Sequence, residues 1–92
     1  MSVLVKIPAQ LRAAAGGESQ TEVEGATVQE VLDGLFELHD ELRERISDED
    51  GTLRRFVNVY LAGEDIRFLE GLQTPVADGS ELTILPAVAG GS

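Results

Sequence analysis

The chain contains no cysteine and no tryptophan, and aromatic residues make up only 4% of it. Without cysteine, the protein has no disulfide, no thiolate nucleophile and no cysteine-ligated metal. It has one histidine, His39, and no partner nucleophile or ligand set accompanies it in the sequence. We therefore interpret His39 as a surface or boundary residue at a helix end. We expect a protein that is not an enzyme and binds no metal.

Positive charge is also scarce, because 7 Lys and Arg residues stand against 17 Asp and Glu residues, for a formal net charge of −10. Such a charge repels phosphate backbones and anionic lipid surfaces, so we expect no nucleic-acid and no membrane partner. No segment has the length of a membrane span or the pattern of a signal peptide. A cytoplasmic location fits these absences, and a protein partner should present a basic or neutral surface.

The 92 residues, 42% of them hydrophobic, suffice for one domain with a single core. Alternating apolar residues predict strands at 2–7, 18–24, 56–61 and 81–86 and a brief strand at 66–68. The second of these is mostly polar, which suits the edge of a sheet. We interpret Leu11 and Arg12 as part of a short connection that ends in the turn Gly16-Gly17.

One amphipathic helix is predicted to begin after Thr27, which has the spacing of a capping box with Glu30. The helix carries an apolar stripe at helical spacing, formed by Val28, Val31, Leu32, Leu35 and Phe36. We interpret this stripe as a packing face. A second short helix is predicted at 40–46, and the acidic loop that follows lacks the spacing of a calcium-binding loop.

This order of elements predicts an α+β fold of the β-grasp kind, with a mixed sheet of four or five strands and one main helix packed across it. The first and last strands would lie side by side in parallel, with the helix as their crossover. We expect residues 1–86 to form this domain and residues 87–92 to form a flexible tail that contains a diglycine.

The tail has no charged side chain and includes Gly90 and Gly91. A glycine backbone can enter a channel that is closed to bulkier residues. We interpret four residues as the part inserted into a partner, namely Ala87, Val88, Ala89 and Gly90. Extended at about 3.3 Å per residue, residues 87–91 would reach roughly 16 Å. The alternative for such a terminus is a frayed, solvated end.

Strand alternation also predicts an outward face of the sheet that docks a partner. Its members are Leu4, Phe56, Asn58, Tyr60, Thr83 and Leu85. If the first, last and third strands are neighbours, then Leu4, Tyr60 and Leu85 would form one exposed apolar patch beside the tail. The alternative is a set of scattered surface hydrophobic residues.

Three stretches, residues 55–60, 64–68 and 82–91, together resemble the ubiquitin-like sulfur carriers of the ThiS/MoaD family. Within that family the chain is most similar to the carrier of the actinobacterial thiocarboxylate route to cysteine. The likeness spans essentially the whole chain and places the diglycine directly after the last strand. It implies a ubiquitin-like β-grasp and a carrier rather than a catalyst.

The resemblance implies that an E1-like adenylating enzyme of the MoeB/ThiF type uses ATP to activate the carboxylate of Gly91. Sulfur would displace AMP, and the resulting thiocarboxylate would pass its sulfur to a partner synthase. In the cysteine route, a metalloprotease of the JAMM type would then release the product. The carrier itself would bind no cofactor. Cysteine is the favoured product, although thiamine thiazole, molybdopterin and thiosugar routes use similar carriers.

Ser92 departs from the family pattern because it follows the diglycine. While Ser92 is attached, the carboxyl group of Gly91 is an amide and cannot be adenylated. Either a protease removes Ser92 or this residue was added for expression. Two other functions stay open: a ubiquitin-like modifier that forms isopeptide bonds through Gly91, and a β-grasp binding module with an inert tail.

Overall fold

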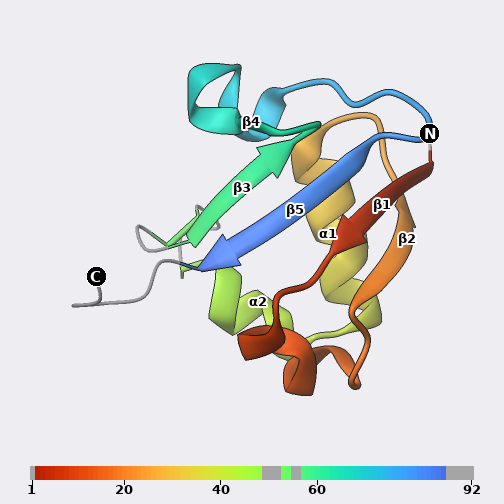
Figure 1. Cartoon of the computed structure of the whole chain (residues 1–92), viewed down its shortest axis with the longest axis vertical. Coiled ribbons are helices and arrows are strands. Elements are labelled where there is room, and N and C mark those ends of the chain that lie inside the picture. The colour runs from red at the N-terminus through yellow and green to blue at the C-terminus, as the bar shows by residue number, and fades with distance from the viewer. Residues whose placement is uncertain (1, 49–52, 55–56, 87–92) are drawn as a thin grey trace.

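The structure, a computed structural model, describes residues 2–48, 53–54 and 57–86 (Figure 1). Its five strands are β1 (Ser2–Lys6), β2 (Gln20–Glu24), β3 (Val57–Leu61), β4 (Glu64–Asp65) and β5 (Glu81–Pro86). They form one sheet in the order β2-β1-β5-β3-β4. Strands β1 and β5 run parallel, and the other neighbouring pairs run antiparallel. The predicted α+β β-grasp, with a mixed sheet, is confirmed.

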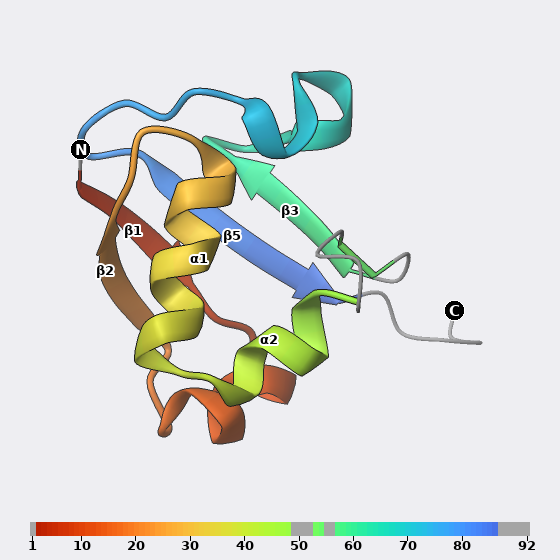
Figure 2. The ribbon, with the colours of Figure 1, turned by 180° about the vertical axis from the view of Figure 1, so that it is seen from behind.

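Helix α1 (Val28–Leu38) crosses one face of the sheet, as Figure 2 shows from behind. Thr27 caps its start by accepting a hydrogen bond from the Glu30 backbone N–H at 3.2 Å. The Glu30 carboxylate reaches back to the N–H of Ala26 at 2.9 Å, one residue before the one that a standard capping box uses. The predicted start of the helix is thus confirmed, with this shift in the reciprocal bond.

The core lies between α1 and the sheet. All five residues of the predicted apolar stripe are at most 5% exposed. From the sheet, the alternate residues of the three central strands face them, namely Val3, Val5, Val57, Val59, Leu82 and Ile84. The short helix α2 (Glu41–Ile46), predicted at 40–46, adds Leu42 and Ile46 at the end of this core. His39 caps the end of α1 and is half-buried, as predicted.

Gly25, between β2 and α1, lies where no side chain fits. A Cβ there would come within 2.8 Å of the backbone nitrogen of Val31 and 2.9 Å of its Cγ2. Both atoms belong to the first turns of a packed helix, so neither yields easily. The absence of a side chain at Gly25 therefore allows β2 to lead directly into α1.

Two sequence predictions about local structure were wrong. Residues 9–15 are not a simple connection but a 3-10 helix (Ala9–Ala15), with Leu11, Ala14 and Ala15 buried at helical spacing. The brief strand expected at 66–68 is also a 3-10 helix (Ile66–Phe68), and the strand is the preceding pair, β4. The Asp65 carboxylate accepts a hydrogen bond from the Arg67 N–H at 2.9 Å, and this local turn leads the chain out of the sheet.

No helix in the part of the chain that the structure describes is both long and apolar enough to cross a bilayer. The acidic loop expected at 47–51 lies partly outside the described residues. Its first residue, Ser47, forms an isolated antiparallel bridge with Leu53.

Candidate functional site

Strand β5 lies in the middle of the sheet, between β1 and β3 (Figure 1). Its last residue, Pro86, is opposite Val57 at the start of β3. Strand β1 pairs with β5 only over residues 81–83, so β3 alone pairs with the end of β5 from which the chain leaves the fold. The predicted tail, Ala87, Val88, Ala89, Gly90, Gly91 and Ser92, lies outside the described residues, so the roles assigned to it stay predictions.

Four of the six predicted docking residues come together on the sheet face opposite α1. The strand register places Asn58 opposite Leu85 and Tyr60 opposite Thr83. Leu85 is 45% exposed, and the other three are half-buried. We call this group, Asn58, Tyr60, Thr83 and Leu85, the β3–β5 face. It occupies the half of the sheet from which the tail leaves.

Leu4 does not join the β3–β5 face. The parallel register of β1 and β5 places it opposite Glu81, four residues before Leu85. At about 3.3 Å per residue, that separation is roughly 13 Å along the strand. An ion pair between Lys6 and Glu81, with 3.3 Å between Nζ and Oε1, lies on the same sheet face. The single patch of Leu4, Tyr60 and Leu85 expected from the sequence is therefore divided, and Phe56 lies outside the described residues.

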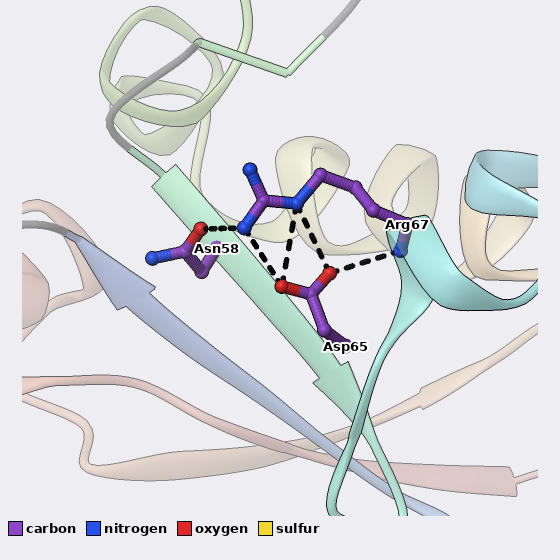
Figure 3. A network of polar contacts seen from close by, with 3 residues as sticks. All are labelled: Asn58, Asp65 and Arg67. Atoms are coloured by element: carbon purple, nitrogen blue, oxygen red, sulfur yellow. Dashed lines mark hydrogen bonds and ion pairs between the residues drawn. The ribbon is translucent and has the colours of Figure 1, made fainter.

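A polar network borders this face, as Figure 3 shows for Asn58, Asp65 and Arg67. The Arg67 guanidinium donates from Nη2 to Asp65 Oδ2 at 2.8 Å and to Asn58 Oδ1 at 2.6 Å. Its Nε lies 3.2 and 3.3 Å from the two Asp65 oxygens. The side chain of Arg67 therefore connects the turn after β4 to Asn58, near the start of β3.

The Asp65 side chain is only 7% exposed, whereas that of Arg67 is 63% exposed. The side-chain hydrogen bond from Arg67, followed by the bond from the Arg67 backbone N–H, lowers the pKa of Asp65. The same carboxylate raises the pKa of Arg67. Both groups are therefore ionised over the physiological range, and the arginine neutralises the one strongly buried carboxylate among the described residues.

Neither this network nor the exposure of Phe68 was predicted from the sequence; Phe68 is 86% exposed in the turn after β4. Asp65 and Arg67 are two residues apart, which is the spacing of a side chain that bonds the backbone of its own turn. That signal was present in the sequence. The contact between Arg67 and Asn58 has no such signal in the sequence, because it joins residues nine apart in different elements.

The histidine and carboxylate side chains of the described residues are dispersed. Nowhere among them do three or more histidine or carboxylate side chains gather as a metal site. His39 lies at the end of α1, in contact range of the Gly16 position and not beside the β3–β5 face.

Comparison with known proteins agrees with this architecture. The model of the ThiS family matches residues 5–91. The chain belongs to the ThiS family. It is 45% identical to the sulfur carrier protein CysO of Mycobacterium tuberculosis over 93 aligned residues, covering 99% of this chain and 100% of that protein.

Two solved structures extend the comparison. A chain in the crystal structure of the Amycolatopsis orientalis BexX/CysO complex is 49% identical, with a TM-score of 0.89 over 97% of this chain and 99% of that one. SAMP1 from Haloferax volcanii is 34% identical, with a TM-score of 0.86 over 99% of this chain and 100% of that one. This ThiS-family chain thus shares its whole fold with both proteins.

Proposed function

We propose that this protein is a sulfur carrier whose working atom is the carboxylate carbon of Gly91. The observation that carries the proposal is the 45% identity to a sulfur carrier, CysO, over essentially the full length of both chains. Gly90 and Gly91 follow β5 within five residues of Pro86. A slim terminus that leaves a central strand suits delivery into an enclosed site of another protein.

The chemistry requires an activating partner, because a free carboxylate is a poor acyl donor. An E1-like enzyme of the MoeB/ThiF type would catalyse attack of the Gly91 carboxylate on the α-phosphorus of ATP, with release of pyrophosphate. A sulfur nucleophile then attacks the acyl carbon, and the bond to the AMP oxygen breaks as the carbon–sulfur bond forms. The carrier contributes the acyl group, and ATP is consumed on the partner.

The β3–β5 face serves as the docking surface for such partners. Exposed Leu85 beside half-buried Tyr60 gives an apolar centre close to the end of β5. The net charge of −10 favours partners with a basic or neutral surface and speeds encounter with a basic one. The solved BexX/CysO complex supports the idea that a carrier of this type is held by a partner protein.

Cysteine is the product that we favour, on the strength of the similarity to CysO. A synthase would then join the sulfur of the thiocarboxylate to an aminoacrylate, and a JAMM-type metalloprotease would hydrolyse the bond that links the product to the carbonyl of Gly91. The same kind of protease is a candidate for removing Ser92, which must be lost before Gly91 has a free carboxylate. The protein would act in the cytoplasm.

Intact mass spectrometry of the protein isolated from its native source tests this function. We expect a species that lacks Ser92 and carries one sulfur in place of one oxygen. Alkylation of that sulfur should add one label to the peptide that ends in Gly91. A population that retains Ser92 and never carries sulfur would contradict the proposal.

A second function, protein modification, has a specific observation in its favour. The small archaeal modifier protein SAMP1 of Haloferax volcanii matches the whole chain with 34% identity. In that case Gly91 would form isopeptide bonds with lysines. Tryptic digests of the host proteome would then contain lysines that carry the terminal residues of this chain, and these would disappear when Gly91 is deleted.

A further inference from the structure

A small cleft lies along the outer edge of β3, on the side away from β5. Its walls include four aliphatic side chains, those of Leu53, Val57, Val59 and Ile66, together with Arg54 and the Asp65–Arg67 pair. Its volume is about 140 Å³. An apolar cavity of about 150 Å³ is large enough to hold benzene, so this cleft has room for one branched aliphatic side chain.

On this side, β3 is paired with another strand only near its end. In the part of the chain that the structure describes, β4 pairs only with Tyr60 and Leu61. The N–H of Val57 donates to the carbonyl of Arg54 at 2.9 Å, so it points away from β5. In an antiparallel strand, alternate peptide groups point to the same side, so those of Val59 also face the cleft. Val57 and Val59 are only 4% and 1% exposed, so they form the floor of the cleft, and an added extended segment would meet this edge only inside the cleft.

The charge of the cleft is opposite to that of the whole protein. Two of the seven basic residues of the chain, Arg54 and Arg67, line it against one carboxylate, Asp65, whereas the net charge of the chain is −10. Arg54 is anchored by a bond from Nε to the carbonyl of Glu44 at 2.7 Å. Arg67 is anchored by Asp65 and Asn58, and Figure 3 shows its other terminal nitrogen pointing away from both of these residues. Each guanidinium is therefore held in place while part of it faces outward.

We propose that this cleft binds a short extended acidic segment of a partner protein, with one branched aliphatic side chain in the cavity and carboxylates at Arg54 and Arg67. Side chains of an extended segment alternate between its two sides. Val57 and Val59 face the α1 side, whereas Asn58 and its partner Arg67 lie on the other. A sequence in which aliphatic and acidic residues alternate fits this arrangement.

The acidic character of the ligand follows from the charges of the protein. An acidic segment is repelled by most of the surface, so it gains affinity only where the guanidiniums are grouped. A basic segment would be attracted elsewhere and would meet two arginines at the cleft. The cleft and the tail are thus separate binding elements, and this inference does not depend on the sulfur chemistry.

The test is a titration of the ¹⁵N-labelled protein with a blocked hexapeptide of alternating isoleucine and aspartate, followed by amide chemical shifts at low ionic strength. The matched probe is the hexapeptide of alternating isoleucine and lysine. We expect saturable shifts concentrated at Val57, Val59, Ile66 and Arg67. The lysine peptide should bind at least about tenfold more weakly, because charge-assisted hydrogen bonds to the arginines are lost.

Two charge-removing variants sharpen the test. Arg54→Gln and Arg67→Gln should each weaken binding of the aspartate peptide by about tenfold. Lys6→Gln, which removes the same charge from β1, should change it by less than about twofold. If Arg67→Gln lowers the melting temperature because Asp65 loses its partner, Arg54→Gln and the peptide pair still decide the question.

Equal affinity for the two peptides would overturn the proposal, because it would indicate apolar adhesion alone. Shifts centred on the β3–β5 face, or no shifts at millimolar peptide, would also overturn it. So would concentration-dependent shifts at the cleft without peptide, which would identify a second copy of this chain as its occupant. None of these measurements uses an activating enzyme or sulfur, so their failure is distinct from failure of the carrier function.

Discussion

The guanidinium of Arg67 holds the nearly buried carboxylate of Asp65 with its Nη2 2.8 Å from Oδ2, while the backbone N–H of the same arginine donates to Oδ1 at 2.9 Å. One residue thus satisfies the carboxylate from two directions. This pairing fixes the turn after β4 against β3, and it makes the stability of the fold depend on the charge of Asp65.

Replacement of Asp65 by asparagine should lower the free energy of unfolding at neutral pH. The folded-state pKa of Asp65 is lowered from its ordinary value of 3.8, so the ionised carboxylate stabilises the folded state above that value. This contribution is lost as the pH falls through the lowered pKa. Urea unfolding of wild type and Asp65→Asn between pH 2 and 7 measures the difference, which should shrink on acidification.

The matched control for that experiment is Asp33→Asn, because Asp33 is an exposed carboxylate on α1. It leaves the Asp65–Arg67 pair in place, so its stability should follow that of the wild type across the pH range. A constant difference between wild type and Asp65→Asn at all pH values would show that the ion pair contributes nothing through charge.

Removal of the cap of α1 should destabilise the fold. Thr27→Ala removes the oxygen that accepts from the Glu30 N–H, and loss of such a cap costs about 1 kcal/mol. Thr27→Ser keeps the hydroxyl oxygen and should retain most of the stability. Thermal unfolding of the three proteins compares them, and equal stability of the alanine and serine variants would exclude the cap as a contributor.

A methyl group at Gly25 should destabilise the protein by roughly 1–3 kcal/mol, because the backbone of α1 must move to admit it. The nearest atom would be the Val31 backbone nitrogen at 2.8 Å. Glu24→Ala, one residue earlier on the exposed side of β2, is the matched control and should have little effect. Chemical denaturation measures both, and a neutral Gly25→Ala would mean that the helix relaxes without strain.

A charge introduced on the β3–β5 face should weaken recognition of this carrier by its activating enzyme. Leu85→Asp places a charge at its apolar centre and should lower the kcat/KM of the activating enzyme for this carrier by at least about tenfold, since it buries a charge without a partner. The matched control is Leu38→Asp. Leu38 is also an exposed leucine, 58% exposed, but it lies on α1 and not on the β3–β5 face. Equal effects of the two variants would place the docking surface elsewhere.

Local patterns predicted much of this fold, because its core elements depend on short-range spacing. The Thr27 cap and the apolar stripe of α1 lie within ten consecutive residues, 27–36, and both were predicted. The 3-10 helix at Ala9–Ala15 was missed, because an alanine-rich segment offers little contrast between its buried and exposed sides. The contact between Asn58 and Arg67 depends on tertiary packing.

Leu4 illustrates the limit of strand alternation. Alternation correctly assigned its face, but it says nothing about how far one strand is shifted along its neighbour. The parallel pairing of β1 with β5 sets Leu4 opposite Glu81 rather than near Leu85. Which residues share a face was therefore predictable, whereas which of them touch was decided by the register.

The most direct measurement uses the protein shortened so that it ends at Gly91, mixed with an E1-like adenylating enzyme, ATP and a sulfur donor. Mass spectrometry should show an acyl adenylate and then a thiocarboxylate on Gly91. The form that retains Ser92 should show neither. If the shortened protein acquires neither AMP nor sulfur with an enzyme that activates CysO, the account of this chain as a sulfur carrier is contradicted.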